Sequence, residues 1–175
     1  GVGFFQIEGI RRIEEGSREK AENLKIALLH SRFRAFREER EKCAALLAGN
    51  SDAARAAKIG DTGFLLPWGQ LFLDSPRLSR IFFTDMEGTV LARAHAPYRF
   101  GDHLGSHPIV ASALRGETSS GIFSLEGELL LLHSLPVKLY GEIQVGTVVV
   151  GTKLTPEYLT LLAEGAVSGM ELKVQ

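Results

Sequence analysis

The second half of the chain alternates short β-rich runs with turn signals, and this pattern limits the fold more than any other feature. One turn is predicted from Asp85 to Gly88, and another has Glu126 and Gly127 as its central residues. Asp and Gly favour such turns because they tolerate the backbone angles of hairpin loops. We therefore predict an antiparallel sheet of five strands, with one short helix inserted after the second strand. The runs that form it are Ile81–Asp85, Thr89–His95, Ser119–Val137, which holds two strands, and Gly141–Leu154.

The first quarter of the chain has the pattern of one long helix. From Gln6 to about Ala48 it is rich in Glu, Arg and Lys, has no proline, and places apolar residues near helical spacing, with a break near Gly16 left open. About 40 helical residues would span roughly 60 Å. Because so small a sheet cannot cover that length, we expect part of the helix to project or to pair with another chain.

Shorter elements surround the predicted sheet. Gly49 and Asn50 indicate a helix end, and Ser51 or Asp52 is expected to cap a second helix to about Ile59. A third short helix is expected within Phe64–Pro76. After the sheet, Thr155 is expected to cap a terminal helix, Pro156–Gly165. The last residues, Gly169–Gln175, alternate like a strand, either an added edge strand or the start of a following module.

Composition excludes several classes of protein. With 175 residues, 45% of them hydrophobic, the chain can bury a real core, and a net charge of −1 argues against a nucleic-acid surface. The single cysteine, Cys43, excludes an internal disulfide. No run approaches the roughly 20 apolar residues of a membrane span. The apolar start, Gly1–Ile7, is expected to follow a hydrophobic segment, although tag residues before an ordinary helix are the alternative.

Four short motifs in this order resemble the Cache family, the extracytoplasmic PAS-like sensor domains of bacterial chemoreceptors and sensor kinases. They are the turn Asp85–Gly88, the helix end Ala113–Gly116, the strand-ending Pro136 and the glycine-punctuated strand Val145–Gly151. The resemblance implies an α+β fold in which a long N-terminal helix packs on a five-stranded antiparallel PAS-like sheet. It also implies that one face of the sheet holds a small ligand.

The resemblance divides the chain into three parts. Residues 1–60 would be a membrane-proximal helical segment for dimerisation and signalling, and residues 61–154 would be the sensor sheet. Residues 155–175 would be a C-terminal helix and tail that lead to a second module or to a membrane span.

Charged residues on two strands suggest the ligand. Strand alternation places Leu91, Arg93 and His95 on one face of the second strand and His133 on one face of the fourth, and we expect the Arg and His side chains to look into one cavity. The planar guanidinium and the imidazoles suit a small organic anion. The predicted ligand-binding residues are Arg93, His95, Tyr98, Ser120, Gly121, Ile122 and His133.

The charge count favours a monocarboxylate. In citrate-type members of the family, one basic residue lies three positions before the proline that ends the fourth strand and another lies directly before it. Those places hold His133 and Leu135 here. One fixed cation fewer favours a short acid such as acetate or propionate over a tricarboxylate.

Other interpretations of these residues remain open. In one interpretation, Arg93 pairs with an acidic residue and His133 is a core histidine. In another, His95, His103, His107 and His133 form a metal site, but Pro108 biases His107 away from helix, so no metal site is predicted. The sequence has no Gly-x-Ser-x-Gly motif and no phosphate-binding glycine loop, so we predict no catalytic residues, no cofactor and no enzyme activity.

The sequence and the resemblance together predict the periplasmic sensor domain of an inner-membrane receptor, either a chemotaxis transducer or the sensor kinase of a two-component system. Its expected partners are a small organic anion, a second copy of the chain, and the membrane through flanking transmembrane helices, but no nucleic acid. The alternative function is a structural or dimerisation module that binds no ligand.

Overall fold

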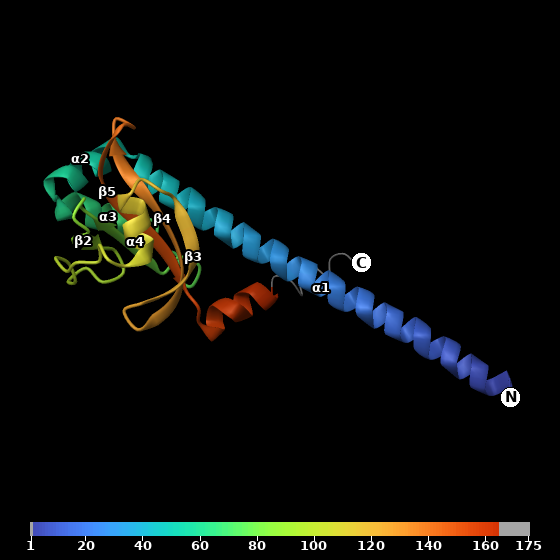
Figure 1. Ribbon diagram of the computed structural model, residues 1–175. Helices are drawn as coiled ribbons and strands as arrows, with labels where there is room; N and C mark the ends of the chain where they lie inside the picture. The colour runs from blue at the N-terminus through green and yellow to red at the C-terminus, as the bar shows by residue number, and fades with distance from the viewer. Residues whose placement is uncertain (1, 165–175) are drawn as a thin grey trace. The chain divides into compact units, whose positions relative to one another are not determined.

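The computed structural model describes residues 2–164 (Figure 1). It contains four named helices, five strands and a last helical stretch over 156–164. The helices are α1 (Val2–Gly49), α2 (Ser51–Ile59), α3 (Thr62–Gln70) and α4 (Pro108–Leu114). The strands are β1 (Arg80–Thr84), β2 (Val90–Arg93), β3 (Ser119–Leu125), β4 (Glu128–Leu139) and β5 (Ile143–Lys153).

The chain divides into two compact units. Residues 36–158 form one unit, which holds the end of α1 and the whole sheet. Among the described residues, the other unit holds the earlier part of α1 and residues 159–164. The division of the sequence into parts at residues 60 and 154 stays a prediction.

Helix α1 runs unbroken past Gly16. A glycine inside a helix costs only about 1 kcal/mol relative to alanine, which the neighbouring helix formers offset. The next helix starts one residue earlier than predicted. Asn50, rather than Ser51 or Asp52, is the cap of α2, because its side chain accepts a hydrogen bond from the Ala53 N–H at 2.9 Å.

The sheet is antiparallel throughout, with the strand order β2-β1-β5-β4-β3, which confirms the five-stranded prediction. Strand β5 lies in the middle and is buried on both faces over most of its length. This explains its three consecutive valines, Val148–Val150, because a strand covered on both sides favours apolar residues on both faces. The predicted turn at Glu126 and Gly127 is also present, since both residues have the positive φ that a two-residue hairpin loop requires.

Each face of the sheet has its own hydrophobic core. The face that we call the α1 face carries Phe83 and Val148, which belong to the same core as Leu47 of α1 and residues of α2 and α3. The opposite face, the α4 face, carries Phe82, and its core includes Ile109 of α4. The sheet therefore separates two groups of side chains that cannot touch across it.

A bulge in the first hairpin changes which side chains share a face. Phe83 pairs with Ala92, but the next residue, Thr84, pairs with Val90, so Leu91 is skipped. Leu91 consequently packs against the core of the α1 face, while Arg93, which pairs with Phe82, lies on the α4 face. The prediction that Leu91 and Arg93 share a face was wrong for this reason.

We expect Gly146→Ala to destabilise the sheet strongly. A Cβ atom at Gly146 would lie 2.1 Å from the carbonyl oxygen of Thr84, a backbone atom in a paired strand that has little freedom to move. Overpacking of this kind lowers the free energy of unfolding by about 1–3 kcal/mol or more. Urea denaturation measures the loss. The control is Gly16→Ala, where no atom lies within 4 Å and stability should not fall.

Candidate functional site

The sheet divides the predicted ligand residues between its two faces. Arg93 pairs with Phe82, Phe82 with Val149, and Val149 with Ser134, so these four residues share the α4 face. His133 precedes Ser134 and therefore lies on the α1 face. The expectation that Arg93 and His133 look into one cavity was wrong, because strand alternation gives the faces within each strand but not which faces of two strands coincide.

The guanidinium of Arg93 is fully buried and bound by the chain's own carboxylates. Its two terminal nitrogens donate to the two oxygens of Asp102, at 2.6 Å each, and Nη2 also donates to Glu126 Oε1 at 2.6 Å. Nη1 further donates to the carbonyl oxygen of Arg99 at 2.8 Å. The ion pair that the sequence left open as an alternative is therefore present, as a bidentate contact with a second acid beside it.

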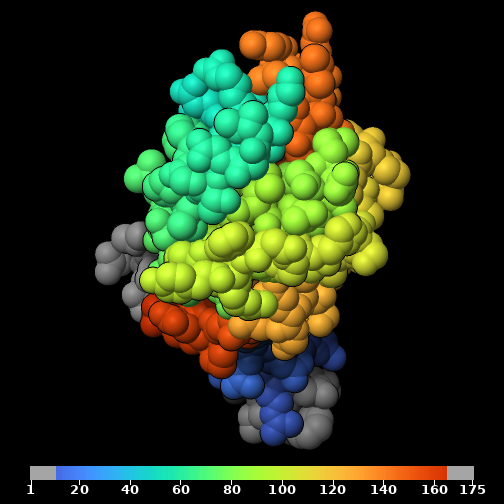
Figure 2. Space-filling model, turned by 90° about the vertical axis from the view of Figure 1, so that its left-hand side faces the viewer, coloured from blue at the N-terminus to red at the C-terminus, as the bar shows by residue number. Residues whose placement is uncertain are grey.

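Arg93, Arg99, Asp102 and Glu126, which we call the Arg93 cluster, join three parts of the fold. Arg93 comes from β2, Glu126 from the hairpin turn between β3 and β4, and the other two from the segment 94–107. Arg99 also pairs with Glu126, at 3.3 Å. Figure 2 shows the segment between β2 and α4 as a yellow-green band on the surface. The cluster thus ties this surface segment to the sheet.

The electrostatics of the cluster follow from its geometry. The hydrogen bonds from Arg93 lower the pKa of Asp102, so this carboxylate stays ionised at neutral pH. The Nε atom of Arg93 is buried without a hydrogen-bond partner among the described residues. The guanidinium therefore makes its hydrogen bonds through Nη1 and Nη2 alone, to Asp102, Glu126 and the Arg99 carbonyl.

His95 lies beside this cluster and is neutral at physiological pH. Burial, helped by the nearby charge of Arg80, lowers its pKa to about 4. Its Nδ1 atom lies within hydrogen-bond distance of both the N–H and the carbonyl oxygen of Ile81, at 3.2 and 3.3 Å. His95 therefore brings a neutral imidazole to this region rather than a positive charge.

The remaining predicted residues do not join Arg93. His133 is buried on the α1 face, where its Nδ1 atom lies 2.5 Å from the hydroxyl oxygen of Ser120, and burial lowers its pKa. Ile122 has the same face as Ser120 and is 59% exposed. Tyr98 is 96% exposed, and Gly121 lies against the ring of Phe123.

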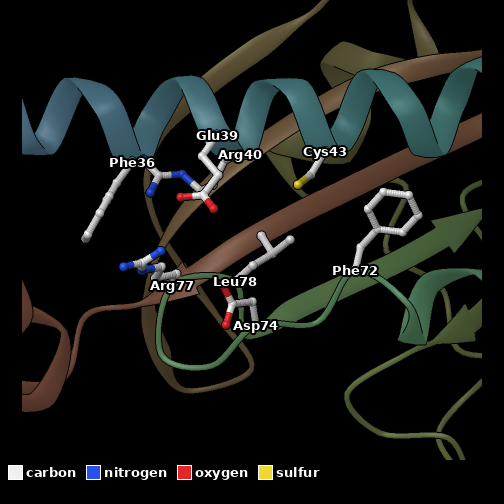
Figure 3. Close-up of a pocket in the computed structure, with 8 residues that line it drawn as sticks. All are labelled: Phe36, Glu39, Arg40, Cys43, Phe72, Asp74, Arg77 and Leu78. Atoms are coloured by element: carbon white, nitrogen blue, oxygen red, sulfur yellow. The ribbon is translucent and has the colours of Figure 1, made fainter.

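A pocket of different composition lies on the α1 side of the sheet. Figure 3 shows side chains of α1 facing the loop that follows α3, with the guanidinium of Arg40 on one side and that of Arg77 on the other. Arg40 is buried and donates to Thr152 and to the hydroxyl of Tyr158, at 3.4 and 3.3 Å. The lining residues are Phe36, Glu39, Arg40, Cys43, Phe72, Asp74, Arg77 and Leu78, none of which was predicted as a ligand residue.

Sequence reasoning missed Asp102 and Glu126. These two acids are 9 and 33 residues away from Arg93 in the sequence, so no helix or strand periodicity predicts the contacts. The contacts depend instead on how the segment 94–107 and the β3–β4 turn fold back toward β2. The metal site considered for the histidines has no support in residues 2–164, where no group of three or more His, Cys, Asp or Glu side chains is placed to hold an ion. His107 instead caps α4, accepting from the Ile109 N–H.

Replacing Arg93 with Met should destabilise the unit of residues 36–158 by about 3 kcal/mol. The change leaves Asp102 and Glu126 without the buried guanidinium that now pairs with both carboxylates. Arg115→Met is the matched control. Arg115 pairs with Glu117 at the surface, where loss of an ion pair changes stability by less than about 1 kcal/mol. Equal losses in the two variants, measured by urea denaturation, would contradict a structural role for the Arg93 cluster.

Stability should also depend on pH through His95. The unfolded chain takes up a proton near pH 6.5, whereas the folded chain does so only near pH 4, so stability is highest above pH 6.5 and falls as the pH drops toward 4. His95→Gln should flatten this part of the curve of unfolding free energy against pH. His30→Gln, at an exposed position of α1, should leave the slope as it is.

Residues 62–172 match the family model described as the double sensory domain of two-component sensor kinases. A search of curated protein sequences finds no match. Within residues 2–164, no helix is both long and apolar enough to cross a bilayer.

Solved sensor domains share the fold at low sequence identity. The E. coli DcuS sensor domain is 18% identical with a TM-score of 0.63, and the alignment covers 77% of this chain and 97% of that one. The sensor domain of the V. cholerae histidine kinase DctB is 15% identical with a TM-score of 0.64, over 81% of this chain and 56% of that one.

A third similar structure is the ligand-binding domain of the Pseudomonas aeruginosa amino acid chemoreceptor PctC in complex with GABA. It is 20% identical with a TM-score of 0.58, over 81% of this chain and 63% of that one. This chain thus spans nearly all of one relative and about three fifths of the other two. The chain belongs to the family of double sensory domains of two-component sensor kinases, and its sheet is that of a Cache sensor domain.

Proposed function

We propose that this chain is the extracytoplasmic ligand-binding domain of a membrane receptor, a sensor kinase or a chemotaxis transducer, and that its ligand is a small monocarboxylate. The observation that carries the proposal is the buried guanidinium of Arg93, which already binds carboxylates on the α4 face. A ligand carboxylate offers the same two oxygens that Asp102 offers now, so it can take the place of Asp102 at the guanidinium.

Asp102 is the acid best suited to be replaced. Its side chain is 48% exposed, so releasing it to water carries a small desolvation change, whereas Glu126 is more buried and is also held by Arg99. The exchange of one carboxylate for another keeps the charge on the α4 face constant. A second carboxylate would add a negative charge beside Glu126, and His95 is neutral and cannot balance it. This charge balance favours a monocarboxylate such as acetate or propionate.

The same exchange supplies a signal. Asp102 belongs to the segment that is hydrogen-bonded along β2, where the Val90 N–H donates to the Asp102 carbonyl at 2.8 Å. When the ligand occupies Arg93, the segment 94–107 loses the contact between the Asp102 side chain and the guanidinium. The ligand favours the arrangement without this contact by its differential affinity. We propose that the terminal helices pass this change to flanking transmembrane helices and to an output module, in a receptor that functions as a homodimer.

The alternative is a structural or dimerisation module without a ligand. The hydrogen bonds that Asp102 and Glu126 already make to the terminal nitrogens of Arg93 support this alternative, because a guanidinium whose partners are never released is a structural group. The two functions differ in their response to added acids and to loss of the internal competitor.

A thermal-shift screen against acetate, propionate, pyruvate, lactate, succinate and citrate, at fixed pH and ionic strength, tests the proposal. A monocarboxylate should raise the melting temperature selectively. Asp102→Asn should start from a lower melting temperature but bind that acid about tenfold more tightly, because the competing carboxylate is gone.

The control for this test is Glu117→Gln, which removes an exposed acid away from Arg93. It should leave both stability and affinity near the values of the parent chain. No response to any acid in the parent chain and in Asp102→Asn would favour the structural module, and selective binding of a di- or tricarboxylate would contradict the charge argument.

A further inference from the structure

A further pocket, which we call the β5-end pocket, lies where β5 ends and the last helical stretch begins. Its volume is about 90 Å³. Because about 10–15 Å³ of such space holds one water molecule, it has room for several water-sized groups. All of its lining residues belong to the unit of residues 36–158. They are two cations, three hydroxyl residues, one acid and one proline, namely Ser75, Pro76, Ser79, Arg80, Lys153, Thr155 and Glu157.

The two cations of this pocket share one carboxylate, that of Glu128. Nε and Nη2 of Arg80 donate to Glu128 Oε2, at 3.0 and 2.6 Å, and Lys153 Nζ lies 3.0 Å from Glu128 Oε1. Nη1 of Arg80 donates to the carbonyl oxygen of Ser79 at 2.7 Å. These contacts use three of the five N–H hydrogens of the guanidinium and one of the three hydrogens of the ammonium group. Both cations therefore retain donors, and their two positive charges share a single carboxylate.

The hydroxyl groups of Ser79 and Thr155 are left as donors. Ser79 Oγ accepts from the backbone N–H of Lys153 at 3.0 Å, and Thr155 Oγ1 accepts from the N–H of Tyr158 at 3.1 Å. Since each oxygen already accepts a backbone hydrogen bond, its own hydrogen is available to donate. No acceptor for these two hydrogens lies among residues 2–164. The β5-end pocket is therefore rich in donors.

The lining of the pocket selects a ligand that is negatively charged and accepts hydrogen bonds on every side. Glu157 is the one acid of the lining, and it is exposed, so water screens its charge. All the outer atoms of a phosphate or sulfate group are oxygens, which suits a lining of cations and hydroxyl groups. The apolar end of a carboxylic acid, in contrast, would find Pro76 as its apolar contact in this lining.

We propose that the β5-end pocket binds a tetrahedral oxyanion, a phosphate or sulfate group. The bound group would join the segment 75–79, the end of β5 and the first turn of the last helical stretch. Because β5 leads into that stretch, the oxyanion would hold the start of the helix against the sheet. This input is independent of the carboxylate proposed at Arg93. The residues that hold the oxyanion are Arg80, Lys153, Ser79 and Thr155.

Isothermal titration calorimetry of the full chain with sodium sulfate and sodium phosphate tests the site, at fixed pH and ionic strength. A melting temperature would not be decisive, because both salts stabilise proteins by exclusion from their surface. Each oxyanion should bind saturably, with one ion per chain, whereas sodium chloride should give no saturable heat. Tighter binding of inorganic phosphate than of glycerol phosphate identifies a free ion as the ligand, and the reverse order identifies a phosphate monoester. Either order supports the site.

Two variants locate the bound oxyanion. Lys153→Met should weaken sulfate binding about tenfold, because one charge-assisted hydrogen bond is lost. Glu157→Gln should strengthen it severalfold, because the change removes a negative charge from the lining. The matched controls, Lys138→Met and Glu164→Gln, remove the same charges at exposed positions outside this lining and should leave the affinity unchanged.

Two results would overturn the proposal. One is the absence of saturable oxyanion binding in both the parent chain and Glu157→Gln. The other is an equal loss of affinity in Lys153→Met and Lys138→Met, which would show that the oxyanion responds to the net charge of the chain rather than to this pocket.

Discussion

The burial of β5 on both of its faces is the constraint on which the rest of this structure depends. The strand pairs with β1 on one side and β4 on the other, and it contributes Val148 to one core and Val149 to the other. Its tight packing uses Gly146, where any larger residue would meet the backbone of β1. Because β5 fixes the register of its neighbours, it also fixes which side chains reach each face, and therefore which residues can cooperate in a site.

The placement of Arg93 shows how the register of the sheet puts a charged group in a buried position. A buried guanidinium is favourable only when its donors meet acceptors, because removal from water is costly for a charge. Asp102 and Glu126 supply them here, at the meeting point of a surface segment and a hairpin turn. In the function that we propose, these internal carboxylates hold the position of a ligand carboxylate and so give the sensor a resting state. The exposure of the Asp102 side chain would then make its contact with Arg93 the reversible one.

The exchange proposed at Arg93 depends on one irregularity in the backbone. The bulge beside Thr84 shifts the register of β2 against β1 by one residue, and this places Arg93 on the α4 face.

The sequence by itself determined the elements of this protein, because local signals specify them: helix formers for α1, turn residues at Gly88 and Gly127, and β-branched runs for the strands. It also determined the Cache fold through motif order. Only the tertiary structure decided the site. Whether Arg93 and His133 share a face depends on a bulge and on register between distant strands, and the partners of Arg93 depend on a loop that returns to the sheet. Contacts of that kind join residues without a fixed spacing, so no pattern in the sequence encodes them.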